Sequence, residues 1–349
     1  MHIPHVVTLT QFMNEAQRKI PGATGDFTGL ISDIATASKV IANAIGRGAL
    51  VATGKDLNQR LEAMANDVML QAGIATGHLA AMASEDMEGI AQLPAGQQRG
   101  KYLLAFDPLN GSGNLDINFQ SGTIFSIMRA ADAKRKPREE DFLNPGKQLL
   151  CAGIVQYGAS TRLILTTGHG VDGFTLDREI GEYVLTHPQM QIPTESTTFA
   201  INASNEKYWE PPVRRYVQEC MAGKEGPRGK DFGMRWVASL VSEAYRILTR
   251  GGVFLYPHDE RTREQGGRLG LIYEANPIAF IVEQAGGSAI TGRNRILDIK
   301  PAELHQRAPF IFGSKSEVER LHQYHQDYVA GKDLDGYNMP LFSSRSLFR

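Results

Sequence analysis

The sequence predicts an α/β protein with α+β features, built from two halves. The chain has 349 residues, enough for two domains of ordinary size. Helical spacing of apolar residues is followed by short strand-like runs, and this order occurs twice, which predicts helices stacked in layers against sheets. A polar, proline-bearing stretch at 188–196 marks the expected boundary. We therefore expect one domain at 1–195, a second at 196–330 and a loose tail at 331–349.

The first half is expected to open with two helices and continue with strands. Apolar residues recur at helical spacing from Leu30 to Ile45 and again from Leu57 to Val68. The charged residues 132–147 carry two prolines and predict an exposed connection. Short apolar runs bounded by glycine, proline or charge predict strands at Leu79–Ala83, Tyr102–Phe106, Thr123–Met128, Gly153–Tyr157, Arg162–Thr166 and Gly181–Thr186.

The second half is expected to mix helices and strands in the same way. Asn276 is a favoured N-cap and Pro277 suits the first position of a helix, so a helix is expected to begin there. Gly286 and Gly287 are expected to end it. The patterns before it predict one helix and two strands, at Arg235–Thr249, Val253–Tyr256 and Leu271–Tyr273.

Composition excludes several classes of protein. The 37 Lys and Arg residues nearly balance 38 Asp and Glu, and the net charge of -1 argues against a nucleic-acid or acidic-membrane binder. Cys151 and Cys220 lack the spacing of a zinc knuckle or a disulfide framework. The N-terminus lacks a signal-peptide pattern, and no apolar run reaches the ~20 residues that span a bilayer. We expect a cytoplasmic protein with no nucleic-acid or membrane partner.

Acidic residues follow the ends of expected strands. Glu85 and Asp86 follow the first predicted strand, Asp107 ends the second, and Glu274 ends the last. Ligands of open α/β sheets bind beyond the carboxyl ends of strands, and magnesium prefers oxygen ligands. A single acid in such a place is also typical of a solvated turn or of a helix N-terminus. Together the four acids favour a magnesium site.

A glycine-rich run, Asn110–Asn114, lies close behind Asp107. Its two glycines allow close backbone approach, and successive amides together with the Ser112 hydroxyl could form a concave anion site. A phosphate cradle beside metal carboxylates would serve phosphoryl chemistry. A Gly-Ser loop is also typical of a flexible linker, so this pattern alone leaves both interpretations open.

Several segments, in order, resemble the signatures of class I fructose-1,6-bisphosphatase. The resemblance extends from about residue 9 to about residue 325 and implies a layered α-β-α-β-α sugar-phosphatase fold, usually assembled as a homotetramer. The W-D-x-x-A-G element of the related inositol monophosphatases is absent. The matching segments are Met82–Glu85, Phe106–Ser112, Gly122–Phe125, Leu271–Pro277 and Leu304–Arg307.

The resemblance implies a phosphoric monoester hydrolase that removes the 1-phosphate of fructose 1,6-bisphosphate, giving fructose 6-phosphate, in gluconeogenesis or Calvin-type carbohydrate metabolism. Asp67 would be a further acid near the metals. Asp86 would activate the attacking water. Two or more Mg²⁺ ions per subunit, which Mn²⁺ could replace, would be bound by Glu85, Asp107, the Leu109 carbonyl, Asn110 and Glu274.

The same resemblance implies where the sugar bisphosphate binds. The glycine-rich run would contact the substrate through Asn110, Gly111, Ser112 and Gly113. The far phosphate would be held by Asn202, Tyr256 and Arg268, together with Arg235 from a neighbouring subunit.

The chain departs from the family pattern near the reacting phosphate. In the pattern D-P-L-D-G-S-S, the second Asp is Asn110 here and the last Ser is Gly113. Gly270 stands where the family commonly has Arg, Arg268 where it has Lys, and Glu62 where it has Asp. Two alternatives follow: a preference for sedoheptulose 1,7-bisphosphate, or a weakly active paralogue that binds sugar phosphate. Restoring Asn110→Asp and Gly270→Arg would discriminate the paralogue from a working enzyme, and an assay of both sugars with Mg²⁺ would test the substrate preference.

A second site is expected before the first long helix, at Thr24, Gly25, Asp26 and Thr28. Asp26 and Thr28 could cap that helix, and a helix N-terminus is also a natural phosphate site. The segment resembles the AMP-binding turn of the family. Its partners in that turn would be Lys101, Tyr102 and Arg129, and the resemblance implies allosteric inhibition by AMP.

Overall fold

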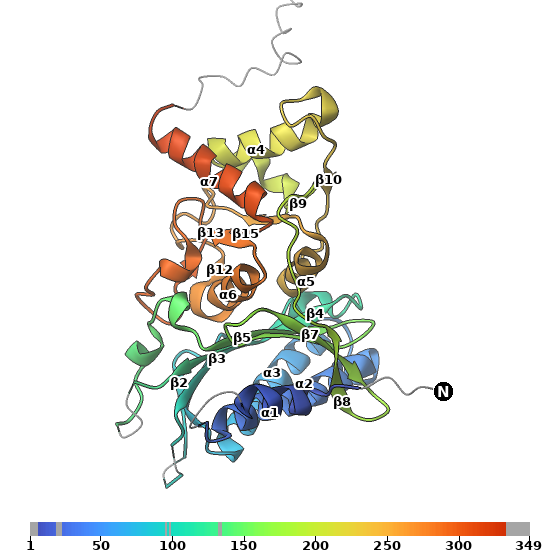
Figure 1. Cartoon of the computed structure of the whole chain (residues 1–349), viewed down its shortest axis with the longest axis vertical. Coiled ribbons are helices and arrows are strands. Elements are labelled where there is room, and N and C mark those ends of the chain that lie inside the picture. The colour runs from blue at the N-terminus through green and yellow to red at the C-terminus, as the bar shows by residue number, and fades with distance from the viewer. Residues whose placement is uncertain (1–5, 19–22, 95, 98, 132–134, 333–349) are drawn as a thin grey trace, which may run out of the picture.

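The computed structural model describes residues 6–18, 23–94, 96–97, 99–131 and 135–332. Within these ranges the chain forms five layers, in the order helices, sheet, helices, sheet, helices (Figure 1). This confirms the expected α/β class and the alternation of helix and sheet layers. Over the same ranges none of the helices combines the length and apolar character of a membrane span.

An outer helical layer and an eight-stranded sheet form the first half. Helices α1 (Leu9–Arg18), α2 (Asp26–Arg47) and α3 (Gly54–Ala75) cover one face of the sheet, and their apolar sides share a core with it. The strand order is β2-β1-β3-β4-β5-β6-β7-β8, with β1 and β3 parallel and the other pairs antiparallel. The strands are β1 Leu79–Ser84, β2 Ile90–Gln92, β3 Tyr102–Asn110, β4 Ser121–Arg129, β5 Cys151–Tyr157, β6 Arg162–Thr166, β7 Asp172–Asp177 and β8 Glu182–His187.

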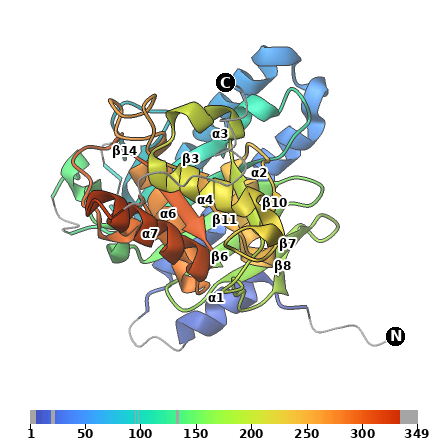
Figure 2. The same cartoon turned by 90° about the horizontal axis from the view of Figure 1, so that it is seen from above.

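The middle layer consists of α5 (Leu240–Arg250) and α6 (Asn276–Gln284), which lie between the two sheets (Figure 1). The second sheet has the order β10-β9-β11-β15-β13, and a separate pair joins β12 to β14. Helices α4 (Pro211–Met221) and α7 (Lys315–Val329) lie side by side over its outer face (Figure 2). The strands are β9 Thr198–Ile201, β10 Gly233–Met234, β11 Val253–Tyr256, β12 Leu269–Gly270, β13 Ser288–Ile290, β14 Arg307–Ala308 and β15 Phe310–Gly313.

Short helical turns connect these elements. The segment Leu271–Ala275 is a π-helical turn that leads directly into α6. The remaining turns are 3₁₀ helices at Gly48–Leu50, Ser112–Asn114, Glu139–Phe142, Gly146–Gln148, Ala203–Tyr208, Gly223–Glu225 and Ile296–Asp298.

The structure confirms most predicted elements and corrects three of them. The helix expected from Arg235 begins only at Leu240, because residues 235–239 are not helical and Ser239 caps the helix. The strand expected at Leu271–Tyr273 is wrong, since that segment is the π-helical turn. Asn276 is not an N-cap either, because the chain is already helical at the preceding residue.

The connection at 132–147 is not simply exposed. Phe142 is fully buried in the core between the sheets, and a Cβ on Gly146 would lie 2.6 Å from the Asn276 Oδ1. Residues 132–134 lie outside the described ranges, as does the expected tail from 333 onward. The segment therefore packs against the core and α6 through buried residues, which its mostly charged sequence did not indicate.

The boundary near residue 195 stays a prediction. Strand β8 of the first sheet ends at His187 and β9 of the second begins at Thr198, so the sheets separate there. One continuous apolar core nevertheless joins the two sheets through α5 and α6. The two halves therefore share a buried interface, which fixes the site that lies between them.

Candidate active site

Glu85 and Asp107 are brought together by two neighbouring parallel strands. Ser84, the last residue of β1, is paired with Phe106 of β3, and the Glu85 amide donates to the Phe106 carbonyl at 3.1 Å. Parallel strands end at the same edge of a sheet, so the residues that follow each pair lie side by side. Glu85 and Asp107 therefore lie side by side as expected, although Asp107 does not end its strand, because β3 continues to Asn110.

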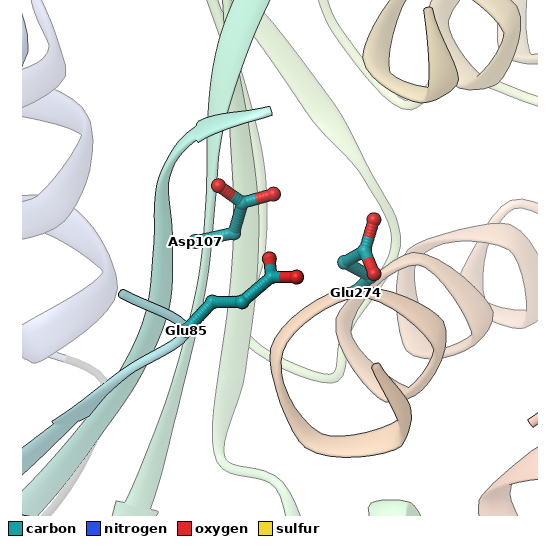
Figure 3. Close-up of side chains that lie close together, drawn as sticks. All are labelled: Glu85, Asp107 and Glu274. Carbon is teal, nitrogen blue, oxygen red and sulfur yellow. The ribbon is translucent and has the colours of Figure 1, made fainter. Parts of the chain in front are cut away.

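Glu274 approaches from the other half of the chain, on the π-helical turn before α6. Its Oε2 accepts a hydrogen bond from the Gly270 amide at 2.7 Å, which holds the carboxylate over the sheet edge. The three side chains point toward one another in Figure 3, and one oxygen of each lies within 4.8 Å of the others. Asp107 and Glu274 are buried, while Glu85 is exposed. Wide helical turns of this kind are frequent at functional sites.

Asn110 bridges two of these carboxylates. The pairing of β3 with β4 shifts between Asp107 and Asn110, a bulge that turns the end of β3. The Asn110 Nδ2 then donates to the Asp107 Oδ2 and the Glu274 Oε1, both at 2.9 Å. The Leu109 amide donates to the Asp107 Oδ1 at 3.1 Å, while the role of the Leu109 carbonyl stays a prediction.

The pKa values of the three carboxyl groups are all raised, chiefly because burial disfavours their charged forms. Burial and then repulsion from Glu85 raise the pKa of Glu274 to about 8. Burial, followed by repulsion from Glu85 and Glu274, raises the pKa of Asp107 well above its ordinary value. Desolvation also raises the pKa of Glu85. Carboxylates crowded in this way are stabilised by a cation, and oxygen ligands suit a hard divalent ion.

Asp86 lies beside this cluster. Desolvation of its carboxyl, and then repulsion from Glu62 and Glu85, raises its pKa to about 6. Its amide donates to the Ser84 Oγ at 3.3 Å. A carboxylate with this pKa is largely deprotonated at neutral pH and can accept a proton.

The structure places Glu62 of α3 near these acids. The Ser112 Oγ donates to the Glu62 Oε1 at 3.1 Å, which links α3 to the glycine-rich run. Asp67 is exposed on α3, and within the described ranges its side chain has no hydrogen-bond or ion-pair partner. Its catalytic role stays a prediction. The sequence indicated Glu62 only as a departure from the family pattern. Its position beside Asp86 and Ser112 is seen only in the tertiary structure.

The glycine-rich run forms a tight turn at the end of β3. Gly111 has φ of 77°, a left-handed conformation that favours glycine, and it precedes the 3₁₀ helix of residues 112–114. A Cβ on Gly113 would meet no atom within 4 Å, so space is open there. The turn is ordered by the Asn114 Nδ2, which donates to the Ala238 carbonyl at 3.0 Å. An ordered turn beside the carboxylates favours the phosphate cradle over the flexible linker.

Two residues expected at the far phosphate lie together near the cluster. The Arg268 guanidinium is 5.3 Å from the centre of the Tyr256 ring. Burial raises the pKa of Tyr256, Arg268 lowers it and Glu274 raises it, so all three share one neighbourhood. Asn202 follows Ile201 of β9, which pairs with the residue before Tyr256 on the parallel strand β11.

Arg235 is exposed beside this group. Its amide donates to the Phe199 carbonyl at 2.7 Å. The next residue, Trp236, packs edge-on against the Tyr256 ring at 5.5 Å between centroids. The position is compatible with a contact to another subunit, and the roles of Asn202, Tyr256, Arg268 and Arg235 stay predictions.

The expected AMP segment forms a polar network at the start of α2. The Lys101 Nζ donates to the Asp26 Oδ2 at 2.7 Å and to the Thr24 Oγ1 at 3.1 Å. The hydrogen bond from Lys101 lowers the pKa of Asp26. Gly25, with φ of 85°, precedes the helix without a side-chain cap, so the expected caps are wrong. Thr28 instead donates to the Gln17 Oε1 at 2.8 Å.

Tyr102 and Arg129 lie at the same end of the sheet. Their positions are paired across β3 and β4, and the Tyr102 ring packs edge-on against Phe27 at 5.6 Å. The structure therefore gathers the expected AMP residues at one end of α2. Whether they bind a nucleotide stays a prediction.

Two cavities lie away from the carboxylates. One of about 320 Å³ is bordered by α2 and the β7–β8 turn, and one of about 460 Å³ is bordered by Glu210, His258 and Arg293. Neither contacts Glu85, Asp107 or Glu274. The candidate active site is therefore identified by the converging carboxylates and not by the size of a cavity.

The chain is similar to known proteins over nearly its whole length. The family "Fructose-1-6-bisphosphatase, N-terminal domain" matches residues 7–188, and the family "Fructose-1-6-bisphosphatase, C-terminal domain" matches residues 192–326. A fructose-1,6-bisphosphatase class 1 from Hydrogenophilus thermoluteolus is 50% identical over 99% of this chain and 98% of its own length. A fructose-1,6-bisphosphatase class 1 3 from Methylibium petroleiphilum is 49% identical over 98% of this chain and 97% of its own.

Solved structures agree with these sequence matches. The fructose-1,6-bisphosphatase of Leishmania major in holo form superposes with a TM-score of 0.85 at 36% identity, covering 91% of this chain and 99% of that one. The same protein in T-state gives a TM-score of 0.84 at 35% identity, covering 93% and 99%. The layered fold is thus a sugar-phosphatase fold, as the sequence resemblance implied.

Proposed function

The chain belongs to the class 1 fructose-1,6-bisphosphatase family, and from this premise we propose that its acidic cluster is the metal centre of the reaction. The chain is a phosphoric monoester hydrolase of carbohydrate metabolism that cleaves fructose 1,6-bisphosphate. One observation carries the assignment of the centre. Oxygens of Glu85, Asp107 and Glu274, from segments distant in sequence, lie within 4.8 Å of one another.

These residues fit a hard divalent cation. Mg²⁺, in two or more copies per subunit and replaceable by Mn²⁺, would be held by Glu85, Asp107, the Leu109 carbonyl, Asn110 and Glu274. The pKa values raised by burial and mutual repulsion are those of ligands that gain most from such an ion. Bound ions supply positive charge that offsets the phosphate oxygens and the charge developing on the leaving sugar oxygen.

The protein residues orient the substrate and move the proton. Asp86 accepts the proton of the attacking water, with Asp67 as a further acid near the centre. The run Asn110–Gly113 holds the reacting 1-phosphate through its amides and the Ser112 hydroxyl. Asn202, Tyr256 and Arg268 hold the far phosphate, and fructose 6-phosphate is released.

A cytoplasmic homotetramer is part of the same proposal. Arg235 is exposed beside the far-phosphate residues, where a guanidinium from a neighbouring subunit could enter the site. Arginine suits this place because its planar fork binds phosphate through two hydrogen bonds. The role fits gluconeogenesis or Calvin-type metabolism.

A phosphate-release assay tests the metal centre. Fructose 1,6-bisphosphate with Mg²⁺ should give phosphate and fructose 6-phosphate. EDTA should abolish turnover, and added Mg²⁺ or Mn²⁺ should restore it. Turnover that persists in EDTA would contradict the proposed centre.

The alternative substrate is tested in the same assay. Asn110 removes a negative charge from the centre and Gly270 removes a positive one, both beside the reacting phosphate. A higher kcat/KM for sedoheptulose 1,7-bisphosphate than for fructose 1,6-bisphosphate would support the sedoheptulose preference. A large gain in turnover from near zero with Asn110→Asp and Gly270→Arg would support the weakly active paralogue.

We also propose that AMP inhibits the enzyme at the start of α2. Thr24, Asp26 and Lys101 already form a connected polar group there, and the backbone amides of a helix N-terminus suit a phosphate. For Lys101 to contact the nucleotide phosphate, its hydrogen bond to Asp26 would have to break. The site lies on the α1–α3 side of the first sheet, whereas the middle helices cover the other face.

Replacing Lys101 with Met is expected to weaken AMP inhibition at least about tenfold, because a charged hydrogen bond to phosphate contributes about 1.5–3 kcal/mol. The readouts are an AMP titration of activity and of thermal stability. Lys147→Met is the matched control, since Lys147 is likewise a surface lysine paired with an acid, Asp298, at 2.9 Å. If AMP leaves both activity and melting temperature of the wild-type protein unchanged, the regulatory proposal is wrong.

A further inference from the structure

The segment 235–239, which connects β10 to α5, contacts both groups of residues that are proposed to bind phosphate. At its first half, the Trp236 ring packs edge-on against Tyr256 at 5.5 Å between centroids. The same ring is stacked on Phe254 at 5.9 Å. The first half of the segment therefore touches a residue proposed to hold the far phosphate.

The second half of the segment contacts the glycine-rich turn. The Asn114 Nδ2 donates to the Ala238 carbonyl at 3.0 Å. The backbone amide of Asn114 donates to the Gly111 carbonyl, also at 3.0 Å, so this asparagine is part of the same tight turn. A Cβ on Gly111 would lie 3.7 Å from the Ser239 Oγ, which is an ordinary van der Waals contact. The turn proposed to hold the reacting phosphate is therefore packed against the segment.

Ala238 has an unusual backbone conformation. Its φ is 54°, in the left-handed region that a residue with a Cβ rarely adopts. Strained conformations persist only where the surrounding structure imposes them, and they cluster at functional sites. On one side the Val237 amide donates to the Glu243 Oε1 at 3.0 Å, and on the other the Ser239 Oγ accepts from the Ser242 amide at 3.4 Å. The backbone is held on both sides of Ala238, which fixes the position of its carbonyl.

Glu243 anchors the segment to α5. Its side chain is fully buried, and its Oε2 accepts from the Arg246 Nε at 2.8 Å. The Arg246 Nη1 donates in turn to the Thr198 Oγ1 of β9 and to the Gly251 carbonyl, both at 3.2 Å. A segment packed in this way transmits a displacement from one end to the other, whereas a loose one would absorb it.

We propose that Asn114 is a positioning residue that couples binding of the far phosphate to the placement of the turn that holds the reacting phosphate. The path leads from the Tyr256 ring to Trp236 and then, two residues along the chain, to the carbonyl that Asn114 binds. The proposal rests on the substrate positions proposed above, with the far phosphate at Tyr256 and the reacting one at residues 110–113. Binding energy of the far phosphate then serves to align the reacting group.

Fructose 1-phosphate, which lacks the far phosphate, tests this coupling. Binding energy that aligns the reacting group raises kcat, so the wild type with Mg²⁺ should have a kcat at least about tenfold higher for fructose 1,6-bisphosphate than for fructose 1-phosphate. Asn114→Ala should remove most of this difference by lowering kcat for the bisphosphate about tenfold and that for fructose 1-phosphate less than about twofold. The inhibition constant of fructose 6-phosphate, which needs only the far site, should stay within about twofold.

Variants of Ala238 test whether Asn114 acts through this carbonyl. Ala238→Val should displace it, because a β-branched residue is disfavoured in the left-handed conformation, and should affect the two sugars as Asn114→Ala does. The double variant should be no slower than the slower single variant, since both remove one contact. Ala238→Gly adopts the conformation without strain and should keep the difference between the two sugars.

Asn144→Ala is the matched control. Asn144 is likewise a half-buried asparagine whose Nδ2 donates to a backbone carbonyl, that of Asp141 at 2.8 Å. Its loss should leave both kcat values and the inhibition by fructose 6-phosphate unchanged.

The outcomes separate this inference from the proposed function. If the wild type does not hydrolyse fructose 1,6-bisphosphate with Mg²⁺, the proposed metal centre is wrong. If the wild type has equal kcat for the two sugars, the coupling is wrong and the centre stands. The role of Asn114 is also wrong if Asn114→Ala lowers both kcat values by one factor, as simple damage to the turn would, or weakens fructose 6-phosphate binding. Effects that multiply in the double variant would exclude the path through Ala238. Where fructose 1-phosphate is turned over too slowly to compare, the double variant decides.

Discussion

Replacing Asp107 with Asn is expected to lower kcat about 10³-fold, because a metal ligand at the reacting phosphate contributes several kcal/mol to the transition state. The same change should stabilise the metal-free protein. Asp107 is buried, and its charged form is disfavoured by burial and by repulsion from Glu85 and Glu274. A substitution that lowers the rate but stabilises the metal-free protein is expected at a binding site whose charges repel one another until the ligand binds.

The pH dependence of stability checks the same point. The pKa of Glu274 is raised from 4.5 to about 8 in the folded protein, so between these values the folded state binds more protons than the unfolded state. Stability of the metal-free protein should therefore fall as pH rises through this window. Asp107→Asn should flatten that fall, because it removes a carboxyl whose own pKa is raised by burial and by Glu85 and Glu274. Bound Mg²⁺ should oppose the fall.

The measurement is denaturant unfolding in EDTA and in Mg²⁺ at several pH values, together with phosphate release. Asp116→Asn is the matched control, since Asp116 is an exposed acid only nine residues away. If Asp107→Asn keeps near-full activity with Mg²⁺, or if it destabilises the metal-free protein at pH 8, the assignment of the cluster is wrong.

Replacing Asp86 with Asn is expected to lower kcat about 10²- to 10⁴-fold, the range typical of losing a general base. Asp86 must be deprotonated to accept a proton from water. The wild-type rate should therefore rise with pH up to about 6, the pKa that desolvation and the charges of Glu62 and Glu85 produce. Because turnover requires bound Mg²⁺, which offsets the charge of Glu85, the rise in rate should be complete at or somewhat below this pH.

Two further variants separate base catalysis from metal binding. Glu62→Gln should move the acidic limb of the rate profile to lower pH, since it removes the repulsion that helps to raise the pKa of Asp86. Glu88→Gln, an exposed acid two residues beyond Asp86, should leave the profile unchanged. An Asp86→Asn variant that keeps wild-type kcat, with the same acidic limb, would exclude Asp86 as the base.

The sequence by itself determined the elements whose signals are local. Helices α2 and α3 and most strands of the first sheet follow from apolar periodicity and from the glycines that bound them. The apolar runs that Glu85 and Asp107 follow were visible for the same reason, although β3 continues beyond Asp107 to Asn110. Because parallel neighbours end at one edge, their meeting could be expected before any coordinates.

Only the tertiary structure decided the contacts made across long sequence separations. The segment before α6 reads as a strand because its residues are apolar, yet burial between two sheets lets it form a wide helical turn that aims Glu274 at the cluster. Asn110 reaches Glu274 across 164 residues. Arg307 faces Gly270 through a strand pair too short for any pattern to indicate. Local periodicity records which face of an element is apolar, but the partner of a buried polar group is set by packing, and packing is decided by the whole fold.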